Sequence, residues 1–164
     1  MTDRGQSWYD TALVCRNGHV ITDTMKTSPG MIAKFCIKCG AEVVSECENC
    51  HADIRGYYHV PGVIGLFEYN PPKFCHECGT AYPWTATRLE ALKEIANQTA
   101  GLSLKEREEL SKSIDDLVKD TPRTELAARA FKRLMKKVPA ETWDTMKPIL
   151  VQVVVEAAKK SLGL

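Results

Sequence analysis

The pattern of hydrophobic and polar positions divides the chain into two parts near residue 83. In the first part, apolar residues occur in short runs of strand-favouring residues between turn-forming residues, which is typical of short strands. We expect strand fragments at 13–14, 20–21, 43–44 and 63–64. In the second part, apolar residues recur with the period of an amphipathic helix. The sequence therefore predicts an α+β protein with one domain at 1–83 and a second at 84–164.

Capping residues indicate where the helices of the second part begin and end. Gly101 is suited to end the first helix, because glycine adopts positive φ angles readily. Ser103 and Glu106 have the spacing of a capping box. Thr121–Pro122 reads as an N-cap followed by a proline at the first helical position. Pro148 either starts a last helix or kinks a longer one. We expect four or five helices that form a small bundle.

One helix of this bundle has an apolar stripe and a basic face. The predicted stripe consists of Leu126, Ala127, Ala130, Phe131, Leu134 and Val138. The basic residues lie largely on the opposite side: Arg129, Lys132, Arg133, Lys136 and Lys137. Such a face is either ordinary solvated surface or a dock for an acidic partner, a nucleic acid or a second copy of the chain.

The first part also contains a dense set of metal-binding residue types. All seven cysteines fall in it, and together with one histidine they form four ordered pairs. The pairs are Cys15 with His19, Cys36 with Cys39, Cys47 with Cys50, and Cys75 with Cys78. Two thiolates separated by two residues can face one tetrahedral ion from a tight turn. The odd number of cysteines argues against a closed set of disulfides.

Eight ligands divide evenly into two closed sites, so we expect two structural Zn²⁺ ions and no catalytic metal. The sequence leaves the pairing open. In sequential order, the first two pairs share one ion and the last two share the other. In the cross-braced order of RING domains, the pairs alternate. RING domains usually carry their histidine in the middle of the ligand series, so His19 in the first pair favours the sequential order.

Several segments around these ligands resemble a family of short bacterial proteins of unknown function that are built on paired zinc ribbons. The segments are 13–21, 35–40, 54–58, 74–79 and Pro83–Trp84. The resemblance covers residues 12–84, and the segment 120–127 is similar to a tail found on several small bacterial proteins. It implies tandem zinc ribbons with short antiparallel strands in a bacterial cytoplasmic protein. It implies no activity.

Charge and aromatic content suggest where a partner could bind. Residues 1–83 carry seven Lys and Arg against nine Asp and Glu, and seven thiolates on two Zn²⁺ ions make this part more acidic. Because phosphate contacts dominate nucleic-acid binding, the ribbons are poorly suited to it. The segment 54–72 contains four aromatic residues, Tyr57, Tyr58, Phe67 and Tyr69. They either pack over the second zinc site or form a recognition surface.

We find no nucleophile–base pair, phosphate-binding loop or carboxylate dyad with a recognisable motif. The sequence therefore favours a non-enzymatic adaptor that binds a protein partner, with self-association through the helical half as a further expectation. The apolar stretch 149–155 is either central in the bundle or shared with another subunit. The alternative is a nucleic-acid-binding protein that uses the basic helix 129–137 and the aromatic loop 57–69. Without a secretory signal or a membrane-spanning run, we expect a cytoplasmic protein.

Overall fold

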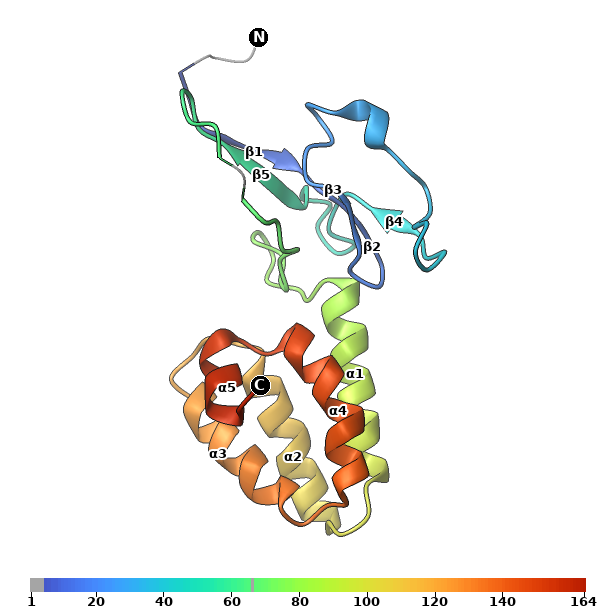
Figure 1. Cartoon of the computed structure of the whole chain (residues 1–164), viewed down its shortest axis with the longest axis vertical. Coiled ribbons are helices and arrows are strands. Elements are labelled where there is room, and N and C mark those ends of the chain that lie inside the picture. Colours follow the sequence, from blue (N-terminus) through green and yellow to red (C-terminus); the bar gives the residue numbers. More distant parts are fainter. Residues whose placement is uncertain (1–4, 66) are drawn as a thin grey trace. The chain divides into compact units, whose positions relative to one another are not determined.

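The computed structural model describes residues 5–65 and 67–164. The chain divides between Ala86 and Thr87 into two compact units. Small antiparallel strands form the first unit, and five helices follow them in sequence (Figure 1). This is the predicted α+β fold class, and the two cysteine-containing clusters of the first unit fit zinc-binding ribbons. No helix in the described part of the chain has the length and apolar character that crossing a membrane requires.

Two small antiparallel sheets make up the first unit. In the two-stranded sheet, β1 (Trp8–Thr11) pairs with β5 (Arg55–His59). In the three-stranded sheet, β2 (Leu13–Cys15) lies between β3 (Val20–Thr22) and β4 (Val43–Val44). A 3₁₀ turn, η1 (Pro29–Met31), lies between β3 and β4. The strand fragments predicted at 13–14, 20–21 and 43–44 are confirmed.

The predicted strand at 63–64 is wrong, since these residues lie in a loop and Ile64 is fully exposed. The segment 54–72 is also not a loop throughout, because β5 lies near its start. Gly56 weakens the sequence signal for this strand, but the fold requires a glycine there. A Cβ at Gly56 would lie 2.1 Å from the carbonyl oxygen of Asp23, and the amide of Tyr57 donates to that same oxygen at 2.8 Å.

The core of the first unit is small and includes metal-ligand candidates. Its buried residues are Ala12, Val14, Cys47, Ile54, Cys75, Tyr82 and Trp84. The rings of Tyr82 and Trp84 stack with centroids 4.8 Å apart, and the indole Nε1 of Trp84 donates to the carbonyl of Pro72 at 3.0 Å. These two residues lie on either side of the domain boundary predicted between residues 83 and 84. In the structure they belong to the core of the first unit.

A buried carboxylate ties the β1–β5 sheet to the loop after β3. The side chain of Asp10 is completely buried and accepts hydrogen bonds from the amides of Thr11, Lys26 and Thr27, and from Nε2 of His59. Burial acts to raise the pKa of Asp10, but these hydrogen bonds outweigh it and hold the pKa below its ordinary value. The carboxylate thus fastens the loop after β3 to the β1–β5 sheet, which strand pairing alone does not do.

The second unit is built from helices and has a continuous apolar core. The helices are α1 (Pro83–Gln98), α2 (Leu104–Leu117), α3 (Thr124–Met135), α4 (Ala140–Val153) and α5 (Glu156–Leu162). Helix α3 packs against both α2 and α5. The capping box is confirmed, since Ser103 Oγ accepts from the amide of Glu106 at 3.3 Å and the Glu106 carboxylate accepts from the amide of Ser103 at 2.9 Å.

Two details of α3 differ from the sequence prediction. The helix begins at Thr124, and Thr121–Pro122 lies in the preceding turn, where the Thr121 hydroxyl accepts from the amide of Arg123 at 3.2 Å. The buried face is also rotated, because Leu126 is 63% exposed while Thr124 and Ala128 are buried. Contacts with α2 and α5 on either side decide which face of α3 is buried, and the sequence of one helix does not contain that information.

The apolar stretch near the end of the chain is not one helix. Pro148 lies inside α4, and the backbone is extended at Val154 and Val155. The amide of Val155 donates to the carbonyl of Leu117 at 3.1 Å, so this break closes against the end of α2. Leu150, Val153 and Val154 are buried within the unit, whereas Val151 is 40% exposed, so one face of the stretch is central in the bundle.

Gly101 is expected to be essential for the stability of the second unit. Its φ is +87°, and a Cβ there would lie 2.3 Å from the carbonyl oxygen of Lys137. Gly101→Ala should lower the free energy of unfolding by about 1 kcal/mol or more, measured by denaturation followed in the far-UV circular dichroism. The matched control is Gly163→Ala, which has φ +73° but open space around the added carbon. Equal losses in the two variants would contradict a role for the Lys137 contact.

Candidate metal centres

The eight predicted ligands form two groups in which the donor atoms lie within 4.8 Å of one another. The first group is Cys15, His19, Cys36 and Cys39, and the second is Cys47, Cys50, Cys75 and Cys78. The pairing is therefore sequential, and the cross-braced alternative is excluded. Each group offers four protein donors, three sulfurs and one nitrogen in the first and four sulfurs in the second. Either group could hold a metal ion.

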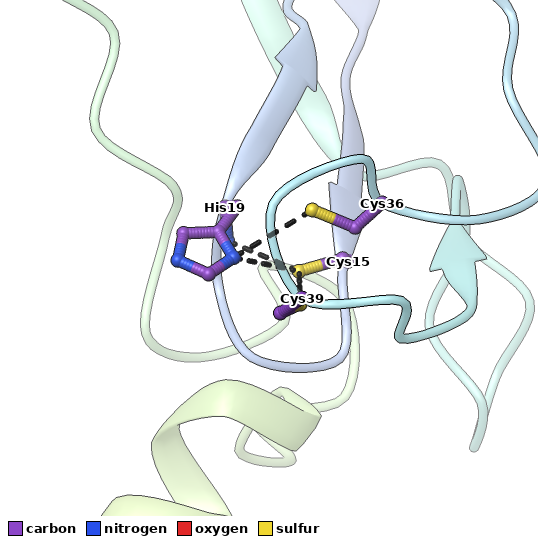
Figure 2. A group of neighbouring side chains, drawn as sticks. All are labelled: Cys15, His19, Cys36 and Cys39. Atoms are coloured by element: carbon purple, nitrogen blue, oxygen red, sulfur yellow. Dashed lines mark hydrogen bonds between the residues drawn. The ribbon is translucent and has the colours of Figure 1, made fainter.

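The three-stranded sheet assembles the first group. Cys15 ends β2, His19 directly precedes β3, and pairing of β4 with β2 brings the hairpin with Cys36 and Cys39 to the same point. Figure 2 shows one ring nitrogen of His19 directed at the sulfur atoms. This nitrogen, Nδ1, lies 3.5 Å from Sγ of Cys15 and 3.6 Å from Sγ of Cys36. The Sγ atoms of Cys15 and Cys39 are 3.7 Å apart.

Three hairpins with the same backbone hydrogen bonds carry the three C-x-x-C pairs. In each hairpin the amide of the first cysteine donates at 2.8 Å to the carbonyl five positions later, in Ala41, Ala52 and Thr80. The fourth residue after the first cysteine closes the turn at Gly40, His51 and Gly79, with φ angles of 71°, 62° and 71°. The second group joins two of these hairpins, with Sγ distances of 3.7 Å between Cys47 and Cys78 and 3.6 Å between Cys50 and Cys75.

These distances match the edges of a metal-centred tetrahedron. Metal–sulfur bonds of about 2.3 Å and a metal–nitrogen bond of about 2.0 Å place two sulfurs about 3.8 Å apart, and a sulfur and a nitrogen about 3.5 Å apart. The observed separations of 3.5 to 3.7 Å agree. They are far longer than the roughly 2 Å of a disulfide, and all seven cysteines are free. The donors therefore fit a tetrahedral ion.

Hydrogen bonds within the hairpins prepare several sulfurs for metal binding. The amide of Ala41 and the side chain of Asn17 lower the pKa of Cys39 to about 6, and hydrogen bonds from Thr80 and Asn49 lower the pKa of Cys78 to about 5. At Cys50 the amide of Ala52 also favours the thiolate, but desolvation and the three neighbouring sulfurs raise the pKa to about 12. Four adjacent thiolates repel one another, so a bound cation is needed before all of them lose their protons.

Tyr82 provides an observation independent of the ligand spacing. Its hydroxyl oxygen is buried and has no hydrogen-bond partner in the described part of the chain. Burial and the nearby sulfur of Cys75 raise the pKa of Tyr82. A buried hydroxyl without a partner is costly, whereas a metal-bound thiolate at Cys75 would accept its hydrogen. Tyr82 therefore fits a metal-loaded second group, and nothing in the sequence signalled this role.

The three histidines outside the first group lie in other environments. His51 faces Glu46 at 2.9 Å, and His76 lies 3.4 Å from Glu77. His59 contacts Asp10 at 3.2 Å and stacks on the ring of Trp8, with centroids 4.3 Å apart. Among the described residues, none of the three belongs to a group of donors that could hold a metal.

The four aromatic residues predicted to form a recognition surface all line one cavity of about 520 Å³ in the first unit. They are Tyr57, Tyr58, Phe67 and Tyr69. Tyr69 also packs against the core that contains Cys47 and Cys75, which agrees with the expectation that part of this segment covers the second metal group. Phe67 is 71% exposed and Tyr58 is 46% exposed. The segment therefore both supports the core and presents aromatic surface.

The predicted basic surface lies on α3 and the turn after it, and its residues are Arg129, Lys132, Arg133, Lys136 and Lys137. Three of them form ion pairs inside the second unit, Arg129 with Glu125, Arg133 with Glu109 and Lys137 with Glu106. Lys132 donates to the carbonyl of Ser161 at 2.9 Å. The Lys137 ammonium, with hydrogen bonds from Ser103, lowers the pKa of Glu106 to about 2. Most of this charge is therefore neutralised locally.

The fold and the two clusters define an α+β protein with a pair of four-donor groups that could each hold a metal ion, followed by a helical unit. The chain belongs to the bacterial family described as "Uncharacterized protein conserved in bacteria (DUF2321)", which matches residues 8–162. The match spans both units, so the resemblance noted for residues 12–84 extends through the helices. Neither the curated proteins nor the solved structures contain a match to this chain.

Removing the Tyr82 hydroxyl should weaken metal binding at the second group alone. Tyr82→Phe keeps the ring stacked on Trp84 but removes the donor next to Cys75, so we expect affinity there to fall about tenfold or more. Competition between the protein and a chromogenic chelator for Zn²⁺ measures the two sites separately. Tyr9→Phe, in which a hydroxyl is lost from an exposed residue of β1, is the control. Unchanged affinity in Tyr82→Phe would contradict the assigned hydrogen bond.

Proposed function

We propose that this protein is a zinc-binding, non-enzymatic adaptor of the bacterial cytoplasm, in which two zinc ribbons hold a surface that binds a protein partner. The observation that carries the proposal is the closure of both groups, each with four protein donors around one point. A catalytic zinc keeps three protein ligands and an open position for water or substrate. With four protein ligands each, the ions are structural.

The chemistry of the donors supports zinc as the metal. Sets of three or four thiolates in tetrahedral geometry select Zn²⁺ or iron–sulfur clusters, while Mg²⁺ and Ca²⁺ require oxygen ligands. The imidazole Nδ1 in the first group fits a single zinc ion with three cysteines and one histidine. Free thiols throughout the chain agree with a reducing compartment such as the cytoplasm.

The aromatic cavity and its exposed apolar neighbours support a protein partner. Phe67 and Val63 are mostly exposed, and Ile64 is fully exposed. Aromatic and apolar side chains that are exposed together are typical of interaction sites. The surface is located on the unit that the metal ions stabilise. The metal sites therefore support partner binding and need no catalytic role.

Nucleic-acid binding is less well supported. Nucleic-acid binding would use the basic residues of α3 and the turn after it. Three of these residues, Arg129, Arg133 and Lys137, already form ion pairs with acids of α2 and α3. A phosphate would have to displace these carboxylates, and the acidic first unit would repel the backbone. The same ion pairs weaken the case for self-association through this face.

Elemental analysis of the purified chain should find two zinc ions per molecule. Cys36→Ser and Cys75→Ser each remove one ligand from a different group, so each variant should retain one zinc ion and release the other on dialysis against a mild chelator. His76→Asn is the matched control, because His76 is adjacent to the ligand Cys75 but outside both groups. Wild-type protein with one zinc ion or none would contradict the proposal.

Affinity capture from a bacterial lysate should retain a specific protein through the aromatic cavity. Tyr58→Ala and Phe67→Ala should abolish the capture while both zinc ions remain bound. Leu126→Ala removes an exposed apolar side chain from α3 in the other unit and should not affect it. If the capture disappears after nuclease treatment, or if no specific protein is retained, the adaptor proposal is wrong.

A further inference from the structure

The cavity in the first unit combines aromatic walls with acidic groups. Its volume of about 520 Å³ is within the usual range for binding pockets. Aromatic rings come from Tyr57, Tyr58, Phe67 and Tyr69, and carboxylates from Asp23 and Glu68. No lysine, arginine or histidine is among the described residues that line it. The lining is therefore suited to a ligand that is both apolar and positively charged.

The two carboxylates have no pairing cation in the part of the chain that the structure describes. In the ion pairs found among residues 5–65 and 67–164, neither Asp23 nor Glu68 takes part. The charge of Asp23 contributes, after burial, to the raised pKa of Tyr69, which places this carboxylate close to the aromatic wall. Rings and carboxylates that share one cavity both attract a cation, the rings through their electron-rich faces.

Two of the tyrosines are held in place by their own hydroxyl groups. Tyr57 donates to the carbonyl of Gly65 at 3.0 Å, and Tyr69 donates to the carbonyl of Arg55 at 2.7 Å. The nearby guanidinium of Arg55 is over the ring of Tyr9, 4.6 Å from its centroid, and it does not line the cavity. These two rings are thus set before a ligand arrives, which lowers the entropy cost of binding.

We infer that this cavity binds a lysine or arginine side chain from a basic segment of a protein partner, an inference that rests on the adaptor function proposed above. A free organic cation would fill the cavity, which Val63 helps to line, but it would leave the fully exposed Ile64 next to the cavity uncovered. A polypeptide that inserts one cationic side chain can cover Ile64 at the same time. The excess of acidic over basic residues in 1–83 attracts such a segment from a distance.

A second copy of the chain is a poorer occupant than a different protein. The basic side chains that another copy would offer on α3 and the turn after it include Arg129, Arg133 and Lys137, which pair with acids in their own unit. Inserting one of them would leave a carboxylate without its partner. The cationic side chain is therefore expected to come from a different protein.

The test uses the zinc-loaded full chain, labelled with ¹⁵N, and three short synthetic peptides. One peptide contains lysine flanked by apolar residues, and the others carry norleucine or glutamate in its place. The lysine peptide should shift the amide signals of Asp23, Tyr58 and Phe67 and bind about tenfold more tightly than the norleucine peptide. The glutamate peptide should not bind. Equal affinity for lysine and norleucine peptides would overturn the inference.

Variants identify the groups that attract the charge. Asp23→Asn and Glu68→Gln keep the shape of the cavity, and each should weaken binding of the lysine peptide about fivefold or more. Glu108→Gln, at an exposed acid of α2, is the matched control and should bind like wild type. Zinc content and circular dichroism verify that each variant is folded. Unchanged affinity in both cavity variants would overturn the inference.

Three further outcomes would overturn the inference, two by identifying a different ligand and one by separating it from the adaptor function. If free butylammonium binds as tightly as the peptide, the cavity is a small-molecule site. If the labelled chain dimerises in light scattering and Asp23→Asn abolishes the dimer, the occupant is a second copy. Each result would overturn the inference. A captured partner that the Asp23→Asn/Glu68→Gln double variant still retains would also overturn it, and would leave the adaptor function intact.

Discussion

The convergence of four donor atoms at each of two points is the constraint on which the first unit depends. Its strands have only two to five residues each, and such short strands bury too little apolar surface to stabilise a fold without cross-links or metal. Cys47 and Cys75 are ligand candidates and core residues at once. Metal binding and core packing are therefore one structural feature, and Tyr82 joins them because its ring is in the core and its hydroxyl lies near the sulfur of Cys75.

The two units differ in how far their charged groups are already paired, and this difference favours the first unit as the site of the proposed partner binding. The helical unit has a large apolar core, and its basic residues on α3 largely pair with its own acids. The first unit instead leaves two carboxylates without a pairing cation among the described residues, next to aromatic rings in a cavity. A surface with unmatched charge and exposed aromatic rings has more binding free energy available than one whose groups are already paired.

Sequence reasoning succeeded where one residue type or a local spacing determines the structure. The capping box at Ser103 and Glu106 forms as predicted, because both hydrogen bonds span three residues. It failed where distant segments decide the outcome. The strand β5 contains a glycine because the backbone of Asp23 passes close to it. His51 has a positive φ angle although it is not a glycine. The reason is that the Cys47–Cys50 hairpin has the same turn as the two hairpins in which Gly40 and Gly79 take this position.

The sequence by itself determined the eight ligands, the α+β order and the position of the helical part, because these follow from residue chemistry and from periodicities within short windows. Only the tertiary structure decided which pairs come together as one donor group, since for the first group that depends on β4 pairing with β2 and not on spacing along the chain. It also decided that Asp23 and Glu68 share a cavity with the aromatic residues. Groups far apart in sequence act together only after the chain has folded, and no local pattern records their distance.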